Sequence, residues 1–226
     1  MINKGRTFFG ILLTLIIIVT LALLAYLAYD YISKYLISQE AAKVVDEFEI
    51  EIENLITVEI SDENQIANEV IENTNTITNT IISNNSSNMQ PSNVKYRGYN
   101  VIGTIQIPKT KVKYPIVDST SSEAMDVAIV MLYGPGLNEE GNTVIVGHNY
   151  RNGGFFGNNK KLEVGDKIYI TDSAGTKVEY TIYNKYMTTD SDFSYATRET
   201  NGKKEISLST CTNDSSKRLV IWAKEN

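Results

Sequence analysis

The chain has 226 residues and a net charge of −6, with one cysteine and one histidine. A single cysteine excludes an intramolecular disulfide and a zinc cluster built on thiolates. A zinc site at His148 would need carboxylate ligands, and none lies at helical spacing from it. The chain has no glycine-rich phosphate loop. We therefore expect no metal, no cofactor and no nucleic-acid partner.

The first apolar segment predicts a membrane anchor. Residues 8–29 are 22 consecutive positions without a charge, and a helix of that length crosses a hydrocarbon core of about 30 Å. The apolar region of a cleavable signal peptide has only about 7 to 15 residues. Lys4 and Arg6 precede the segment and Asp30 follows it. By the positive-inside rule, residues 1–7 lie in the cytoplasm and the chain after the span lies outside the cell.

Charge divides the remaining chain into two unlike parts. Residues 30–92 hold twelve acidic residues and two lysines, a net charge of −10. Residues 93–226 hold 15 acidic and 17 basic residues, a net charge of +2. We interpret the first part as a stalk with a linker and the second as one domain. The low isoelectric point therefore belongs to the stalk.

The stalk is expected to be partly helical and only to lift the domain off the membrane. Apolar residues recur close to helical spacing between Val45 and Ile56, although residues 47–60 also alternate as a strand would. Residues 73–93 consist mainly of Asn, Ser and Thr and predict a flexible spacer.

The domain has the pattern of an all-β protein. Short runs rich in Val, Ile, Thr and Tyr are separated by Gly, Asn and Asp turn signals, and seven or eight such strands predict a sandwich or a barrel. One helix is expected over residues 121–134, with Ser121 or Ser122 as its N-cap. The predicted strands cover residues 101–108, 111–117, 142–148, 167–173, 176–189, 205–211 and 218–224.

Three residues at the margins of these strands form a candidate catalytic set. His148 ends one strand, Cys211 ends another, and Arg218 begins the next. The six residues between Cys211 and Arg218 suit a hairpin, which would bring thiol and guanidinium to the same end. An imidazole can activate a thiol and protonate a leaving amine. Arginine stays protonated and can stabilise an oxyanion.

Less specific interpretations of the same residues stay open on spacing alone. A lone cysteine is usually a small buried apolar residue, and a lone histidine is often structural. Arg218 could pair with Asp214, while Lys217 and Lys224 are expected to be solvated charges.

The sequence around these residues resembles the sortases, membrane-anchored cysteine transpeptidases of Gram-positive bacteria. Leu208-Ser209-Thr210-Cys211 is similar to the family's L-x-T-C signature, and Arg218 stands where the family has its arginine. Gly147-His148 matches its G-H motif, some 60 residues before the cysteine. The flanking strands GNTVIVGH and LEVGDKIYI, and the opening strands GTIQIP and YPIV, extend the likeness over residues 99–224.

The resemblance implies a closed eight-stranded β-barrel and a transpeptidase. Cys211 would cleave an LPxTG-type sorting motif between Thr and Gly through a thioacyl intermediate, which an amine on a cell-wall precursor (peptidoglycan or lipid II) resolves. His148 would be the acid/base and Arg218 the substrate and oxyanion donor. Thr210 and Leu208 would contribute to substrate binding. The loop at residues 191–202 would form a wall of the recognition groove.

The sequence also bears on the sortase class and on two alternative functions. The chain has no Asp-Pro lid motif and only a short segment before residue 205, which favours a class A or class D-like sortase. Glu139 and Glu140 are the only candidates for a calcium site, and we predict none. An L,D-transpeptidase would have Ser-x-Gly-Cys at its cysteine. A non-catalytic wall-binding or adhesion module on the same barrel is the alternative function.

Overall fold

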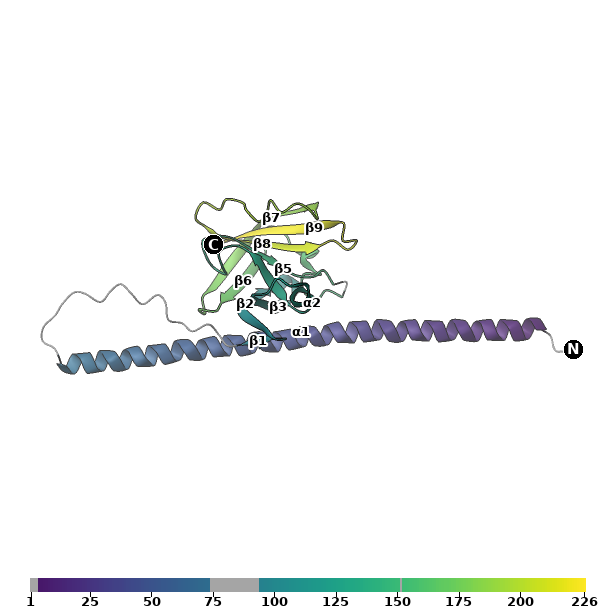
Figure 1. Ribbon diagram of the computed structural model, residues 1–226, viewed down its shortest axis with the longest axis horizontal. Helices are drawn as coiled ribbons and strands as arrows, with labels where there is room; N and C mark the ends of the chain where they lie inside the picture. Colours follow the sequence, from purple (N-terminus) through teal and green to yellow (C-terminus); the bar gives the residue numbers. More distant parts are fainter. Residues whose placement is uncertain (1–3, 74–93, 151) are drawn as a thin grey trace.

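A computed structural model describes residues 4–73, 94–150 and 152–226, and shows a barrel set against one long helix (Figure 1). The spacer expected at residues 73–93 lies almost wholly outside the described residues. The elements in chain order are α1 (Lys4–Asn73), β1 (Lys95–Tyr96), β2 (Tyr99–Ile107), η1 (Pro108–Thr110), β3 (Val112–Val117), α2 (Ser122–Val127), β4 (Ile129–Tyr133), β5 (Gly141–Val146), η2 (Asn159–Lys161), β6 (Lys167–Asp172), β7 (Lys177–Thr189), β8 (Lys204–Cys211) and β9 (Lys217–Glu225).

Eight of the strands close into a barrel, as the family resemblance implied. They pair in the order β2-β3-β4-β5-β8-β9-β7-β6, and pairing of β6 with β2 closes the ring. The two-residue strand β1 pairs with β2 outside it. The pairs β3–β4 and β5–β8 are parallel, and the others are antiparallel. Within the described ranges, closure leaves no long sheet edge unpaired.

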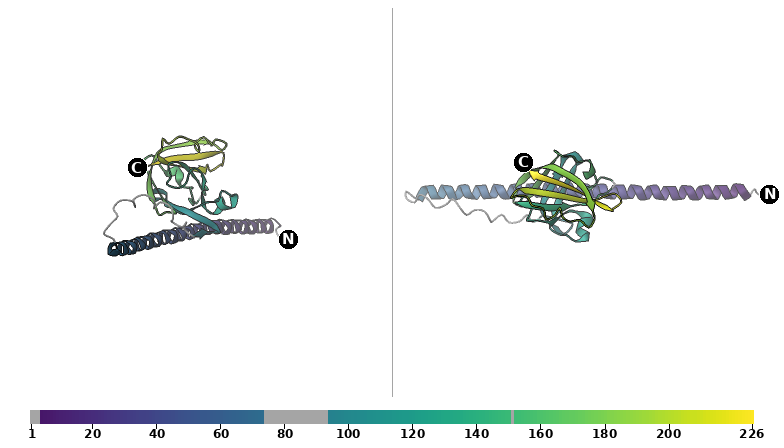
Figure 2. Two further views of the ribbon diagram at one scale, coloured as in Figure 1. Left: turned by 60° about the vertical axis from the view of Figure 1, so that its left-hand side comes forward. Right: turned by 90° about the horizontal axis from the view of Figure 1, so that it is seen from above.

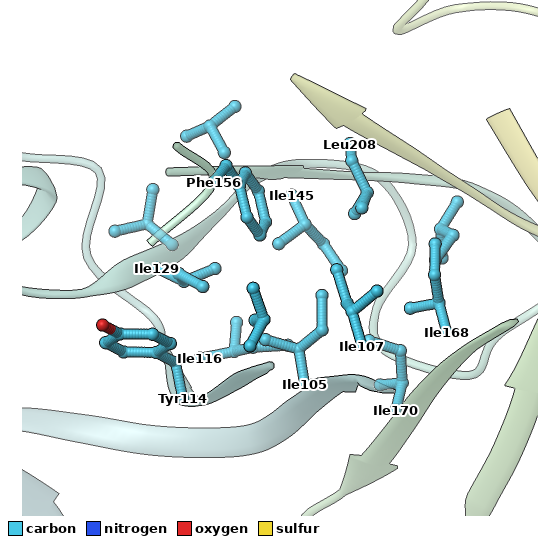
Figure 3. Close-up of a cluster of buried hydrophobic side chains, with 14 of the residues drawn as sticks. Ile105, Ile107, Tyr114, Ile116, Ile129, Ile145, Phe156, Ile168, Ile170 and Leu208 are labelled. Carbon is cyan, nitrogen blue, oxygen red and sulfur yellow. The ribbon is translucent and has the colours of Figure 1, made fainter. Parts of the chain in front are cut away.

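The barrel interior is filled by alternate residues of these strands (Figure 3). β-branched and aromatic side chains dominate it, as the strand pattern predicts. The side chains that meet there include Ile105, Ile107, Ile116, Ile129, Ile145, Ile168, Ile170 and Leu208, with at most 1% of each exposed. This tight interior fixes which residues of each strand face outward.

The segment predicted as a helix over residues 121–134 is a helix only in its first half. The hydroxyl of Ser121 accepts a hydrogen bond from the Ala124 amide, so the predicted N-cap is confirmed. The helix ends at Val127, Ala128 is extended, and β4 follows. The residues of β4 fit a helix as well as a strand because Ile129 to Leu132 are all apolar and do not alternate with polar residues, although Tyr133 at the end of the strand is 53% exposed.

Helix α1 is continuous through the apolar segment and the stalk. Its N-terminal part has a mean hydropathy of 2.9 and is long and apolar enough to cross a membrane. The stalk does more than separate the domain from the membrane, because its middle turns pack on the barrel (Figures 1 and 2). Ala41, Val45, Phe48 and Ile52 lie on one helical face and are buried.

Polar contacts flank this apolar face. Glu40 pairs with Arg97 of the barrel and Asp46 pairs with Lys113. The amide of Gln106 donates to Glu49 at 2.7 Å. Helix α1 also approaches the barrel closely at Gly175, whose φ is +78°. A Cβ at this position would lie 2.5 Å from Cγ2 of Ile52, so only glycine fits there. These contacts fix how α1 lies across the barrel.

We expect Phe48→Ala to lower the stability of the full chain in detergent by about 3 kcal/mol, because it empties a fully buried site between α1 and the barrel. The midpoint of thermal unfolding reports the change. Ile50→Ala is the matched control, since Ile50 is 59% exposed on the same helix. Equal midpoints for the two variants would show that α1 does not pack on the barrel in solution.

Candidate active site

The hairpin of β8 and β9 brings the predicted thiol and guanidinium together. Cys211 and Arg218 are directly opposite each other in the antiparallel register. Nη1 of Arg218 lies 3.8 Å from Sγ of Cys211, which is half-buried. The hairpin predicted from the spacing therefore exists, and its pairing sets the Cys211–Arg218 contact.

Asp214 is engaged within the hairpin turn and not with Arg218. Its carboxylate accepts hydrogen bonds from the Thr212 hydroxyl at 2.6 Å and the Ser216 amide at 3.1 Å. The hydrogen bond from Thr212 is the main cause that lowers the pKa of Asp214 to about 2. The alternative that Arg218 is simply a surface partner of Asp214 is therefore wrong.

Arg218 is instead tied to the loop between β7 and β8. Its Nε donates to the carbonyl oxygen of Asp190 at 3.3 Å, and its guanidinium lies 5.7 Å from the centre of the Phe193 ring. These contacts leave Nη1 directed at the thiol. Lys217 is exposed, in agreement with the expected solvated charge.

His148 is held at the level of Cys211 by its neighbours in sequence. The strands β5 and β8 are parallel, and Val146 lies opposite Ser209. The Thr210 hydroxyl donates to the carbonyl of Gly147 at 2.6 Å. The side-chain amide of Asn149 donates to the carbonyl of Cys211 at 2.8 Å. The residues on both sides of His148, Gly147 through its backbone and Asn149 through its side chain, are thus bonded to Thr210 and Cys211.

The imidazole itself pairs with a carboxylate of α2. Nε2 of His148 lies 3.0 Å from Oδ1 of Asp126, and the ring lies against Tyr150, with centroids 5.2 Å apart. Tyr150 also donates its hydroxyl to the carbonyl oxygen of Asp126 at 3.1 Å. Within the described part of the chain, the ring makes no hydrogen bond to Cys211. The structure brings His148 and Cys211 to the same barrel end, and the imidazole is paired there with the carboxylate of Asp126.

Thr210 and Leu208 differ in how they relate to the site. Thr210 lines the pocket beside Cys211, although its hydroxyl already donates a hydrogen bond to the carbonyl oxygen of Gly147. Leu208 is 1% exposed in the barrel core, between Ile145 and Ile221 in the register. Strand alternation directs it inward, so the expected substrate contact of Leu208 is a misassignment. Leu208 supports the site by packing.

A pocket of about 350 Å³ opens at this barrel end. Its wall is formed by the cysteine strand, the loop after His148 and the end of β7, and its lining includes Cys211, Thr210, Asn149, Lys160, Met187 and Leu219. Mixed apolar and polar lining of this kind is typical of a ligand site. No group of three or more His, Cys, Asp and Glu side chains suited to a metal occurs among the described residues.

Sequence reasoning missed Asn149, Asp126 and Asp190. Asn149 directly follows His148 in the chain, and that adjacency was a usable signal. Asp126 lies 22 residues before His148 on a helix whose placement the sequence does not give. Asp190 acts through its backbone, which carries no residue-type signal.

Comparison with known proteins decides the family. A family model described as the sortase domain matches residues 105–226, which is more than half of the chain. The chain belongs to the sortase family. A search of curated proteins found no match.

Solved sortases share the fold. Sortase A from Corynebacterium diphtheriae is 28% identical with a TM-score of 0.52, and the match covers 57% of this chain and 61% of that one. A sortase D5 transpeptidase from Clostridium perfringens is 29% identical with a TM-score of 0.51, over 56% and 79%. A pilus-related sortase C of Group B Streptococcus is 29% identical with a TM-score of 0.51, over 56% and 67%. Because these relatives are of types A, D and C, the expected class A or D-like subtype stays a prediction.

The loop between β7 and β8 forms one wall of a second pocket in this sortase. The pocket has a volume of about 630 Å³ and lies over β4 and β5, where Ala196, Thr197 and Arg198 of the loop face Tyr133 and Pro135. The same loop reaches Arg218 through Asp190 and Phe193. The loop therefore extends from the thiol end to this pocket. The lining of the pocket at Cys211 includes no residue of the loop, so its expected role as a wall of the recognition groove stays a prediction.

A buried ionic network fastens that loop. Arg198 and Glu205 form an ion pair with side chains only 11% and 9% exposed. Arg198 also donates to Tyr183 and to Asn142, each at 2.9 Å, and lies over the ring of Trp222 at 4.7 Å. Burial, followed by its hydrogen bond to Glu205, raises the pKa of Tyr183 well above its usual range.

We expect Glu205→Gln to cost about 3 kcal/mol of folding free energy, because it leaves the Arg198 charge buried without its partner. The Arg198→Met/Glu205→Gln double variant should lose less than the sum of the two single variants, since no unpaired charge remains. Denaturant unfolding measures all three. Glu199→Gln on the exposed part of the loop is the control, and an equal loss there would contradict the role of the buried pair.

Proposed function

We propose that this sortase is a membrane-anchored cysteine transpeptidase. It cleaves an LPxTG-type sorting motif between Thr and Gly and transfers the new carboxyl end to an amine on a cell-wall precursor (peptidoglycan or lipid II). The observation that carries the proposal is the 3.8 Å contact between Arg218 and the Cys211 thiol at the barrel end that also holds His148. Family membership supports the same chemistry. A Clostridium perfringens sortase C with the C-terminal cell wall sorting motif is 22% identical, which supports the fold alone.

In the first step, the Cys211 thiolate attacks the carbonyl carbon of the motif threonine. A carbon–sulfur bond forms, and the bond to the glycine nitrogen breaks after His148 protonates that nitrogen. Arg218 stabilises the oxyanion that develops during the attack, because its guanidinium directs Nη1 at the sulfur and so at the carbonyl group that bonds to it. The Phe193 and Asp190 contacts hold the guanidinium in this orientation.

In the second step, an incoming amine replaces the sulfur. The amine nitrogen attacks the thioacyl carbon, His148 takes the amine proton, and the carbon–sulfur bond breaks to regenerate Cys211. His148 serves both steps if its ring exchanges Asp126 for the reacting groups. The side chain of His148 is 39% exposed and that of Asp126 is 69% exposed, so their pairing is weak enough to be exchanged.

The membrane arrangement follows from the anchor. We propose a single-pass protein of the cell membrane, with residues 1–7 in the cytoplasm, residues 8–29 in the bilayer and the catalytic domain at residues 93–226 outside the cell. The uncharged run and the basic residues before it support this orientation. The lone thiol then has no second cysteine in the chain with which to form a disulfide.

We expect the full chain in detergent to form a thioacyl adduct with an LPxTG-type peptide, detected by mass spectrometry of the intact protein. Cys211→Ala should form none, because alanine has no nucleophilic sulfur. The control for binding without cleavage is an LPxTG-type peptide in which the Thr–Gly amide is replaced by a methylene-amine linkage, which has no carbonyl carbon for the thiol to attack. Absence of an adduct across a library of sorting motifs would favour a non-catalytic wall-binding or adhesion module.

Arg218→Lys should lower kcat/KM for the same peptide by roughly 100-fold, which corresponds to the loss of one preorganised oxyanion donor. Lysine keeps the charge but lacks the planar fork that reaches both the sulfur and the Asp190 carbonyl. Lys217→Ala is the matched control, because Lys217 is the exposed neighbour. Wild-type turnover in Arg218→Lys would show that the guanidinium is not part of the machinery.

A further inference from the structure

The contacts of α1 give the barrel a direction relative to the apolar segment. Near the start of the stalk, Tyr31, Tyr35 and Ser38 line a pocket of about 190 Å³ together with Gly153 and Asn158 of the loop that follows His148. This loop lies at the barrel end where β5 and β8 finish, which is the catalytic end.

Farther along, α1 reaches the opposite barrel end. Ile52 and Ile56 lie against Gly175, in the turn where β6 ends and β7 begins. The register places that turn at the far end, because β6 and β8 run in opposite directions through their pairings around the barrel. The catalytic end is therefore the end toward the apolar N-terminal part of α1 (Figure 1).

The connection between the apolar segment and the barrel is stiff. No proline or glycine occurs between residues 11 and 73, and these residues cause most sharp helix kinks. From Tyr29, the end of the uncharged run, to Tyr35 is six residues, or about 9 Å along a helix. Tyr26, Tyr29, Tyr31 and Tyr35 are all more than half exposed. Such a group of tyrosines is typical of the membrane–water interface.

We infer that α1 holds the barrel with its catalytic end toward the bilayer, within about 10 Å of the end of the span, so that the enzyme selects peptide substrates tethered close to the membrane surface. This inference rests on the proposed function for its substrate and on the α1 contacts for its geometry. The helix acts as a spacer of fixed length, because the buried face from Ala41 to Ile52 prevents the barrel from turning away.

The orientation is tested by fluorescence, without reference to turnover. In the full chain carrying Cys211→Ala, a single dye is attached through Ser216→Cys at the catalytic end or through Ala174→Cys at the opposite end. Along α1 the two ends are separated by 17 residues between Tyr35 and Ile52, or about 25 Å. In liposomes with an acceptor on the lipid headgroups, the dye at residue 216 should transfer energy more efficiently. Equal or reversed efficiencies would overturn the inference.

The selectivity is tested with one LPxTG-type peptide supplied free in solution or attached to a lipid through flexible tethers of graded length. The wild-type chain in liposomes should have its fastest turnover with a tether that reaches no farther than about 10 Å. A seven-residue helical insertion between Asp30 and Tyr31 adds about 10 Å and nearly two whole turns, so the barrel contacts of α1 from Tyr31 onward are retained. The optimum should move to a tether about 10 Å longer, with turnover of the free peptide unchanged.

An undocked variant completes the test. Phe48→Asp removes the apolar contact of α1, and the preference among tethers should fall to less than twofold while the free peptide is still cleaved. Glu47→Ala, an exposed neighbour, should behave as the wild type. An optimum that does not move with the insertion would overturn the inference. No turnover of the free peptide by the wild type would overturn the proposed function instead, while the fluorescence result would still stand.

Discussion

The parallel pairing of β5 with β8 is the constraint on which the site depends. Two parallel strands end on the same side of a sheet, so the residues that follow Val146 and Ser209 meet at one barrel end. His148 and Cys211 are 63 positions apart in the chain, and this pairing alone brings them to one level. The antiparallel pairing of β8 with β9 then adds Arg218. Barrel closure holds all three strands in fixed register, which a free sheet edge would not.

Local sequence signals predicted the parts of the molecule that depend on local chemistry. Alternation and turn residues predicted the strands of the closed barrel, and the spacing of Cys211 and Arg218 predicted their hairpin. The run that forms β4 fits a helix as well as a strand, because Ile129 to Leu132 are all apolar and show no alternation, and its pairing with β3 and β5 is not encoded locally. The family motif suggests Leu208 as a substrate contact, but a motif does not say toward which side of the strand a side chain points. In the structure the side chain of Leu208 points into the core. The Asp126–His148 pair depends on where α2 packs, which no local pattern encodes.

The loop between β7 and β8 joins the stability of the fold to the chemistry of the thiol. Its far part is fastened by the buried Arg198–Glu205 pair, and its near part contacts Arg218 through Asp190 and Phe193. A buried ion pair adds little net stability compared with apolar packing, but it strongly disfavours arrangements that leave either charge alone. The network therefore restricts the positions that the loop can take. That restriction keeps the guanidinium of Arg218 directed at Cys211 rather than free in solvent.

The acidic stalk and the barrel complement each other in charge as well as in shape. The stalk region has a net charge of −10 and the domain a net charge of +2, and Glu40 and Asp46 of α1 contact Arg97 and Lys113. Exposed pairs of this kind contribute at most about 1 kcal/mol each. The buried face around Phe48 must therefore supply most of the affinity. The charges select the register, because a shift of α1 by one turn would separate both pairs and also move Ile52 off Gly175. The acidic composition of the stalk, which by itself suggests a simple spacer, thus also provides the charges that fix α1 in one position on the barrel.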